Sequence, residues 1–484
     1  MSAHPQLTTP PTQAKRALTV PYLVWFSAPL ALTFLMMSGA APLVSNGITW
    51  MHGAEGERIH LSAFLMTFVT ALFIYSPMFT ARNVAIRTVA DRRSMRTFTL
   101  FYAVGSLISG TLLILVSQSD LIGHLMFGRL LGASSVAENL AREGLMAFVP
   151  IPLFVALRGL GQGCHITNGQ TWYVGVGTLL RFSSMAVFVF GYAVHTELTG
   201  PVLGGLTYLT GIGAETAFVL LTLVGKRQWR THVAGTTMDL AGYFRYAGPL
   251  MLGSLLQQLA GPVLIFMINR AHQSVENGAT YNLIRDTIWI VVSMLMAVQP
   301  AVIAHATSRH NFHVVLKFAA VLLVAITAVT VLLAVTSLRE LIFVRWMEVD
   351  NAAILGLTFT ALFWLIPVPT ITAINHLVNA LHTRSGRTIW VTAGNVAGMV
   401  GLLTVALTLD LASHEGVILA VAGNAGFQLV SAVVQVIGLR RGGLRAAMND
   451  TLLPSEHTPA ASAVAPPTIQ PELAVCPVTE RLRP

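Results

Sequence analysis

The sequence has very little charge. Charged residues make up 10% of the 484 residues, against about 25% in an ordinary soluble protein, and 54% are hydrophobic. So few charges could not cover the surface of a soluble core. The apolar residues instead gather in blocks of about 20, the length at which a helix crosses a bilayer. The sequence therefore predicts an all-α membrane protein with twelve transmembrane helices.

The twelve predicted spans are separated mostly by short loops, and the longest loop is expected at 118–144. The spans are 21–47, 61–81, 97–117, 145–165, 169–194, 203–224, 242–270, 280–304, 314–336, 352–380, 387–410 and 416–438. The first apolar block is too long for a signal peptide and is followed by no small-residue cleavage site, so we expect it to remain as helix 1.

Cysteine is almost absent, and so are the patterns of an enzyme. Cys164 and Cys476 are the two cysteines, and their spacing fits neither a metal site nor a disulfide framework. No phosphate-binding loop, nucleophile elbow or group of metal ligands is recognisable. We expect no cofactor, no metal and no catalytic site. No soluble domain is large enough to hydrolyse a nucleotide, which favours a secondary or passive transporter.

The net charge of +9 follows the membrane topology. Basic residues cluster before helix 1, after helix 12 and in the loops that follow even-numbered helices, whereas acidic residues lie in the other loops. Positive loops mark the cytoplasmic side. This pattern predicts that both termini are cytoplasmic, and it argues against nucleic acid as a partner. We expect the protein in a plasma membrane, namely the bacterial inner membrane. The basic residues are Lys15, Arg16, Arg82, Arg87, Arg92, Arg93, Arg96, Lys226, Arg227, Arg230, Arg309, Lys317, Arg384, Arg387, Arg440, Arg441 and Arg445.

Prolines recur at matching places in the two halves of the chain. The pairs are Pro29 with Pro249, Pro42 with Pro262, Pro77 with Pro300, Pro150 with Pro367 and Pro152 with Pro369. Their offsets run from 217 to 223 residues. His165, Gly169, Thr171 and Gly177 likewise match His382, Gly386, Thr388 and Gly394 at an offset of 217. The chain is therefore read as an internal duplication of six helices.

An even number of helices in each repeat gives both halves the same orientation. We expect two six-helix lobes related by a pseudo-twofold axis along the membrane normal. The expected segments are a disordered cytoplasmic tail at 1–20, a first lobe at 21–225, a cytoplasmic linker at 226–241, a second lobe at 242–440 and a disordered tail at 441–484.

The paired prolines are predicted to bend helices around a central cleft. Proline removes one helical hydrogen bond, and within a bilayer the freed carbonyl must face a neighbouring helix or a wet cavity. Broken helices at matching positions are a pointer to a transport site. The alternative is that each proline only bends its helix for packing.

Polar residues within the spans are candidates for substrate binding, because charge at this depth is costly and usually faces a cavity or a partner. Arg158 and Arg285 are expected to bind anionic groups, while Glu215 and Asp286 would hold these arginines or exchange protons. The remaining candidates are Gln257, Asn375 and Asn46. The structural alternative is that Glu215 pairs with Arg158, that Arg181 and Arg270 snorkel to an interface, and that His165, His376 and His382 cap helices.

The two six-helix lobes, with prolines in helices 1 and 7, resemble the MOP superfamily, which contains the MATE exporters. Several stretches more narrowly resemble the progressive ankylosis (ANK) family. They are Pro77-Met78 with Arg82-Asn83-Val84, then Pro262, Phe266 and Arg270, and FWLIPVPTITAINHL at 363–377. The resemblance implies a MATE-like fold and efflux of polyvalent anions such as pyrophosphate, ATP and citrate.

Alternatives within and beyond that superfamily remain open. MATE drug exporters carry an acidic residue in helix 1, where this chain has Ser45 and Asn46, and lipid II flippases typically have fourteen helices. VADRRSMR at 89–96 is similar to a loop of major facilitator transporters but lacks its glycines. A lipid-linked saccharide flippase, a cation-coupled multidrug exporter and a membrane enzyme are the competing hypotheses. The preferred prediction is a monomeric, alternating-access anion exporter whose partners are the lipid bilayer and a small anionic substrate.

Overall fold

The computed structural model describes residues 18–90, 92–131, 133–192, 195–225, 238–272, 274–346 and 352–440. In these ranges the chain is helical almost throughout, and the one β-pairing is an isolated bridge between His272 and Glu415. Ten helices are long and apolar enough to span a membrane, and two bent helix pairs raise the number of spans to twelve. The predicted fold class is confirmed. Residues 1–17 of the expected first tail, the whole of the expected second tail, most of the expected linker and Cys476 lie outside the described residues.

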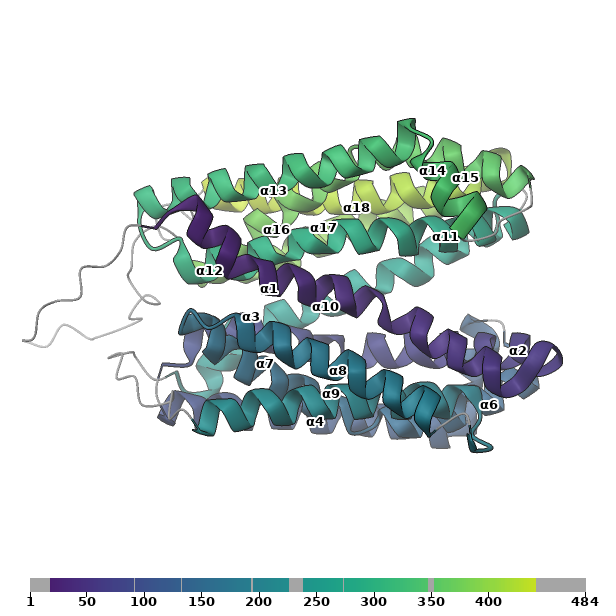
Figure 1. The fold of residues 1–484 in the computed structure, drawn as a ribbon, viewed down its shortest axis with the longest axis horizontal. Coiled ribbons are helices and arrows are strands. Elements are labelled where there is room, and N and C mark those ends of the chain that lie inside the picture. Colours follow the sequence, from purple (N-terminus) through teal and green to yellow (C-terminus); the bar gives the residue numbers. More distant parts are fainter. Residues whose placement is uncertain are drawn as a thin grey trace, which may run out of the picture. The chain divides into compact units, whose positions relative to one another are not determined.

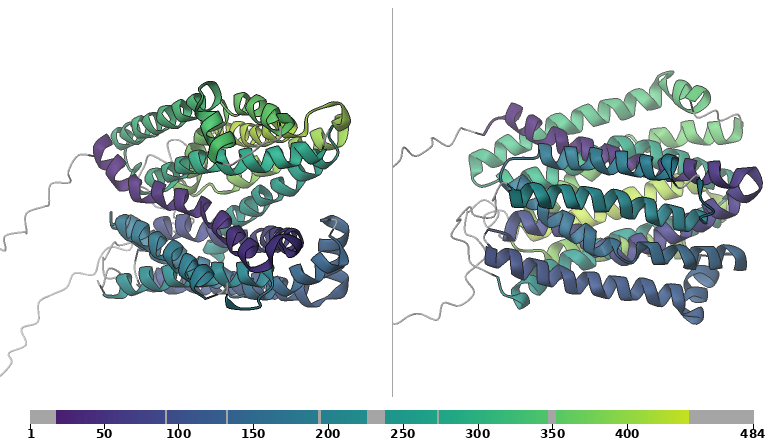
Figure 2. Two further views of the ribbon diagram at one scale, coloured as in Figure 1. Left: turned by 45° about the vertical axis from the view of Figure 1, so that its right-hand side comes forward. Right: turned by 60° about the horizontal axis from the view of Figure 1, so that its bottom comes forward.

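Figure 1 shows the helices as two groups, which largely follow the two halves of the chain, and the left view of Figure 2 shows the same grouping. The first half contains α1 (Val20–Ser38), α2 (Ala40–Tyr75), η1 (Ser76–Thr80), α3 (Ala81–Thr88), α4 (Arg92–Gln118), α5 (Asp120–Gly123), η2 (His124–Leu130), α6 (Ser135–Phe148), α7 (Ile151–Thr167), α8 (Trp172–Gly191) and α9 (Gly200–Gly225). The second half contains α10 (Leu240–Asn269), α11 (Ser274–Val292), η5 (Ser293–Ala297), α12 (Val298–His305), α13 (Arg309–Val335), α14 (Leu338–Glu340), η6 (Leu341–Trp346), α15 (Ala352–Trp364), α16 (Val368–Arg384), α17 (Ile389–Thr408), η7 (Leu411–Ser413) and α18 (Gly416–Gly438).

Helices bend at both Pro-x-Pro sequences. The pair α6 and α7 is bent by 40°, and the pair α15 and α16 by 48°. Pro152 and Pro369 each stand in the first turn of the second member of the pair. A proline is tolerated there because the first N–H groups of a helix have no intrahelical acceptor. The two breaks therefore redirect each half of the chain at the same place. Neither break removes a hydrogen bond from the interior of a helix.

Short 3₁₀ segments interrupt the second span of each half at an offset of 217 residues. η1 contains Pro77, whereas η5 contains no proline. Pro300 follows η5 by three residues, and its missing N–H deprives the carbonyl of Met296 of its helical partner. The interruption therefore precedes Pro300 in the chain and is not centred on it.

The first span of each half differs from the expectation. Pro29 lies inside α1, and Pro249 and Pro262 lie inside a continuous α10. Pro42 falls in the first turn of α2. The interruption in helix 1 is at Gly39, between α1 and α2, where φ is −78° and ψ is −10°. Pro42 follows Gly39 by three residues, and its missing N–H deprives the carbonyl of Ser38 of its helical partner, as Pro300 does for the carbonyl of Met296.

The expected loop at 118–144 is largely helical, which corrects the prediction. α5, η2 and α6 occupy most of it, and α6 begins ten residues before the predicted start of span 4. Ser134 caps α6 by accepting a hydrogen bond from the N–H of Ala137 at 3.4 Å. Such a serine is a favoured N-cap. The polar residues that indicated a loop are instead the first turns of a helix.

The first helix of each half packs against the interrupted helix of the other half. Leu23, Phe26 and Leu30 of α1 belong to a buried cluster with residues of η5, α12, α13 and α16. In return, the Ser254 hydroxyl of α10 donates a 2.8 Å hydrogen bond to the carbonyl of Ser76 in η1. Figure 1 shows α1 running between the two groups. The first helix of each half therefore packs against the other half as well as against its own.

α10 is fastened to α17 by three side chains that donate to its backbone. Thr388 donates to the carbonyl of Tyr246 at 2.7 Å, Thr392 to that of Pro249 and Asn395 to that of Gly253 at 3.0 Å. In the first half, the corresponding helices α1 and α8 meet at a hydroxyl contact in which Thr178 donates to Thr33 at 3.2 Å.

Candidate functional site

A buried ion-pair network lies at mid-depth in the first half, between α7, α8 and α9. Arg158 donates to Glu215 at 3.0 Å, and a nitrogen of Arg181 lies 3.8 Å from the same carboxylate. Gln162 and Thr178 donate to the other carboxylate oxygen at 2.7 and 3.2 Å. We call these five residues the arginine–glutamate cluster. It holds two guanidinium groups and one carboxylate, and all five side chains are buried.

Glycines on α7 make this convergence possible. A Cβ at Gly159 would stand 2.7 Å from the side chain of Ala81 on α3, and one at Gly161 would stand 3.0 Å from Val219 on α9. α3 and α9 therefore approach α7 more closely than side chains would permit. Arg158 and Gln162, one helical turn apart on α7, are brought to Glu215 by this approach.

The second half carries a neutral counterpart of this cluster. Asn375 stands 217 residues after Arg158, and Asn395 stands 217 after Thr178. Ser431 donates to Asn395 at 2.9 Å, and Gln435 donates to Ser431 at 3.0 Å and to Asn375 at 3.3 Å. We call Asn375, Asn395, Ser431 and Gln435 the amide cluster. Charged groups in one half are thus matched by amides and a hydroxyl in the other.

Two matched histidines fasten helices beside these clusters. His165 Nε2 lies 3.2 Å from the carbonyl of Val219, and His382 Nε2 lies 2.8 Å from that of Gln435. Both side chains are fully buried. The turns that follow contain Gly169 and Gly386, whose φ values of +71° and +74° favour glycine. These contacts support the structural interpretation of the two histidines.

The arginine–glutamate cluster is closed in this conformation. Arg158 is 7% exposed and Glu215 is 0% exposed. A crevice beside Arg181, bordered by Met36, Met37 and Ala40 at the break in helix 1, is too narrow for a water molecule. The expected open, wet cavity around Arg158 is therefore not seen in this conformation. The structure instead shows the alternative expectation, in which Arg158 pairs with Glu215.

The other predicted substrate residues do not join this cluster. Asn46 on α2 and Gln257 on α10 are exposed, and Asn375 belongs to the amide cluster. Arg285 is partly buried on α11, in the other half of the chain from Arg158. The side chain of Asp286 lies outside what the structure describes. The structure brings together two of the seven predicted residues, Arg158 and Glu215.

Three members of the cluster were not among the predicted site residues. Gln162 follows Arg158 by one helical turn, a spacing that could have indicated it. Thr178 gives no signal in the sequence, because threonines are common in membrane helices. An interfacial position was the structural alternative for Arg181, yet this side chain is only 5% exposed and packs over the ring of Tyr208 at 5.9 Å.

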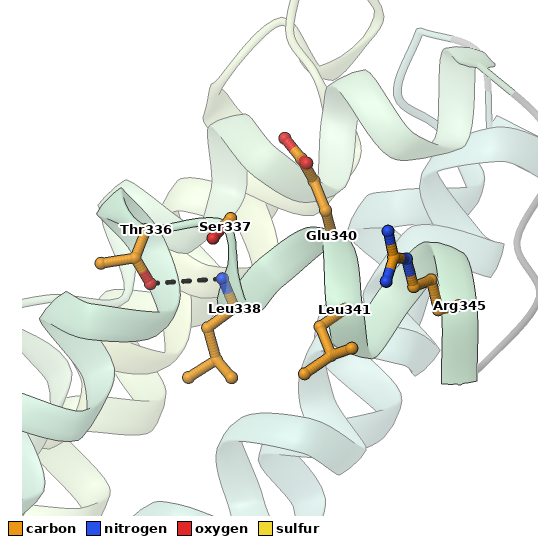
Figure 3. Close-up of a pocket in the computed structure, with 6 residues that line it drawn as sticks. All are labelled: Thr336, Ser337, Leu338, Glu340, Leu341 and Arg345. Atoms are coloured by element: carbon orange, nitrogen blue, oxygen red, sulfur yellow. Dashed lines mark hydrogen bonds between the residues drawn. The ribbon is translucent and has the colours of Figure 1, made fainter.

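A separate pocket lies at one end of the second half, where α13 is followed by α14 and η6. It has a volume of about 380 Å³. Figure 3 shows its lining residues, which are Thr336, Ser337, Leu338, Glu340, Leu341 and Arg345. None of the predicted substrate residues lines it. It therefore does not identify the substrate site.

Neither a protein-family model nor a curated protein sequence matches the chain. Solved structures do. A MATE family transporter of the MOP superfamily in an outward-facing conformation has 18% identity and a TM-score of 0.64, over 88% of this chain and 96% of that one. A MOP superfamily transporter from Pyrococcus furiosus, described as having a binding pocket of reversed polarity, has 15% identity and a TM-score of 0.62, over 88% and 96%.

The Vibrio cholerae MATE transporter VcmN in its bent form has 14% identity and a TM-score of 0.64, over 88% of this chain and 97% of that one. Identities this low show the fold alone. The narrower resemblance to the ANK family continues to rest on the sequence motifs. The protein described here has the twelve-helix fold of the MATE transporters of the MOP superfamily.

Proposed function

We propose that this chain is an alternating-access transporter that exports a small polyvalent anion of the citrate, ATP or pyrophosphate class. The observation that carries the proposal is the arginine–glutamate cluster, where Arg158 and Arg181 share the single carboxylate of Glu215. Two cations against one anion leave a net positive charge at mid-depth. The fold supports transport, because MATE transporters have been solved both outward-facing and in a bent form.

Guanidinium groups suit this substrate class. Arginine presents a planar fork of N–H donors that matches carboxylate and phosphate oxygens. In the conformation described, Glu215 accepts a hydrogen bond from Arg158 and lies 3.8 Å from a nitrogen of Arg181. Protonation of Glu215, or its displacement by substrate, would leave Arg158 and Arg181 with donors for an arriving anion. Glu215 would then act as the group that neutralises the site when it is empty.

The direction of export follows from the proposed topology. If the basic ends of the spans face the cytoplasm, both termini are cytoplasmic, as the charge pattern predicts. A membrane potential that is negative inside favours anion exit by about 2.3 kcal/mol per charge per 100 mV. A polyvalent anion therefore needs no coupling ion in order to leave. A plasma membrane, such as the bacterial inner membrane, would supply this potential.

A cation-coupled multidrug exporter is the second candidate, and Glu215 is the observation that favours it. A buried carboxylate that can take up a proton is a plausible coupling group, and MATE transporters share the fold. The pairing of Glu215 with two arginines weighs against this candidate, because a cationic drug would meet a net positive cluster. The same vesicles can test both candidates.

The test is efflux from liposomes that contain the purified full chain and are loaded with radiolabelled citrate, ATP or pyrophosphate. With a potential that is negative inside, we expect at least one anion to leave faster than from protein-free vesicles. Arg158→Gln should slow this efflux at least about tenfold, because one charge-assisted contact is lost. Arg129→Gln, which changes an exposed arginine, should leave efflux unchanged and serves as the matched control.

The result that would overturn the proposal is wild-type efflux no faster than that of Arg158→Gln vesicles for all three anions. Proton-driven uptake of a lipophilic cation by the same wild-type vesicles, abolished by Glu215→Gln, would establish the multidrug candidate in its place.

A further inference from the structure

We propose that Arg82 and Arg87 of α3 form a binding site for a polyvalent oxyanion between the two halves of the chain, from which the anion reaches the arginine–glutamate cluster. The inference rests on the proposed function and specifies where its substrate binds. The charge pattern of the sequence explains these two arginines only as markers of the cytoplasmic side. Their contacts in the structure indicate a further role.

Neither arginine has a carboxylate partner among the described residues. The guanidinium of Arg82 lies over the ring of Phe34 of α1, at 4.9 Å from its centroid. The Nε atoms of Arg82 and Arg87 and the Oδ1 atom of Asn83 are buried without any hydrogen-bond partner. Buried polar atoms are normally satisfied, and an unsatisfied guanidinium N–H is costly. A bound oxyanion would accept hydrogen bonds from the two Nε–H groups, whereas the Asn83 Oδ1 atom is itself an acceptor and is not a ligand for an anion.

Elements of both halves surround the two arginines. Tyr243 of α10 donates to the hydroxyl of Thr88 at 3.2 Å, so α10 contacts the end of α3. Tyr246, one turn further along α10, lies close enough to both Arg87 and Arg384 for electrostatic interaction, and its hydroxyl donates to the carbonyl of Thr383 at 2.6 Å. A ligand held by Arg87 would therefore touch both halves at once.

The arginines also form a series in depth. Thr167 at the end of α7 donates to the carbonyl of Ile86, so α3 and α7 end at the same level. Gly159, next to Arg158 on α7, lies against Ala81 and the backbone of Arg82 on α3, so Arg82 and Arg158 stand at nearly the same depth. Arg82 is near enough to interact electrostatically with both Arg158 and Glu215. Arg87 thus offers a cation near the end of α3, and Arg82 and Arg158 offer two more at a deeper level.

A purely structural alternative accounts for part of the placement of these two arginines. Arg87 stands in the last turn of α3, where a cation is favoured by the helix dipole and by the positive-inside rule. Neither explanation covers Arg82, which lies inside the span and faces an aromatic ring. Neither explains why the Nε–H donors of both Arg82 and Arg87 are buried without partners. An oxyanion site accounts for both donors.

The test is direct binding of pyrophosphate to the detergent-purified full chain, measured by isothermal titration calorimetry. We expect saturable binding that weakens as salt is raised, since the site is partly exposed. Arg82→Gln and Arg87→Gln should each raise the dissociation constant at least about tenfold. Arg82→Lys should raise the dissociation constant less than Arg82→Gln does, because the positive charge remains. Arg93→Gln, an exposed arginine at the same end, is the matched control and should bind as wild type does.

Wild-type affinity in both Arg82→Gln and Arg87→Gln would overturn the inference, and if efflux persists in wild-type vesicles the proposed function would still stand. Absence of both binding and efflux in the wild-type protein would overturn both. If Arg82→Gln does not fold, Arg82→Lys and Arg87→Gln decide the question. A titration with short-chain phosphatidylglycerol separates the two sources of phosphate: arginine-dependent binding of that lipid alone, without pyrophosphate, would also contradict a substrate site.

Discussion

Glu215 is the residue on which the arginine–glutamate cluster depends. It accepts hydrogen bonds from Arg158, Gln162 and Thr178, and Arg181 lies within 3.8 Å. Removing one partner of a buried ion pair costs about 3–5 kcal/mol, because the other charge is left uncompensated. The loss of stability should therefore depend on how many buried charges a substitution leaves without a counter-charge.

Glu215→Gln should destabilise the protein more than Arg158→Gln. The first substitution leaves two buried arginines without a counter-charge, whereas the second leaves Glu215 paired with Arg181. Thermal unfolding in detergent, followed by tryptophan fluorescence, measures the difference. The double variant should fall between the two single variants. An unfolding temperature for Arg158→Gln at or below that of Glu215→Gln would contradict the assignment of Arg181 as a second partner.

At this scale the sequence indicated the charges but not their partners. Arg158 and Glu215 stood out because charge is rare inside a membrane span. Gln162 and Thr178 did not, since which residues face each other across three helices depends on helix rotation, which spacing alone does not determine. Asn375 was expected at the pathway, and the structure places it in the amide cluster, at the position that corresponds to Arg158.

At the scale of elements, the duplication in the sequence predicted where interruptions recur. The Pro-x-Pro bends and the 3₁₀ segments η1 and η5 lie at the expected offset of 217 residues. In helix 1 the interruption lies at Gly39, three residues before Pro42, whereas the helix continues through Pro29. A proline can remain inside a helix when its neighbours compensate for the lost bond, and sequence alone does not show that compensation.

Gly39→Ala should extend the helix across the junction of α1 and α2. A Cβ at this position would lie 3.4 Å from the ring of Phe182, an ordinary contact, and alanine favours a helix over glycine by about 1 kcal/mol. Hydrogen–deuterium exchange should slow at residues 36–42. The control is Gly401→Ala, where a Cβ would meet nothing within 4 Å inside α17. Faster exchange at the junction in Gly39→Ala would show that glycine is needed there for another reason.

At the scale of the whole molecule, the contact of α10 with η1 holds the two halves together in the described conformation. Ser254 donates to the carbonyl of Ser76 across this contact. Alternating access requires such a contact to open on one side of the membrane. A covalent link at this position should therefore prevent the conformational change without altering the substrate site.

The link can be made with cysteines at Ser76 and Ser254 in a background where Cys164 and Cys476 are replaced by serine. A short bifunctional methanethiosulfonate should reduce anion efflux at least about tenfold, a change that corresponds to about 1.4 kcal/mol, and a reductant should restore it. Each single cysteine variant, treated in the same way, is the control. Full efflux from the cross-linked protein would mean that this contact stays closed during transport.

The amide cluster has a consequence for how the charges of the first half are understood. The second half assembles the same three-helix junction, with the same histidine contact and the same left-handed glycine turn, from uncharged side chains alone. Ionised groups are thus dispensable for building this junction. A neutral junction in the second half therefore stands beside a charged one in the first, so the charges of the first need an explanation other than architecture.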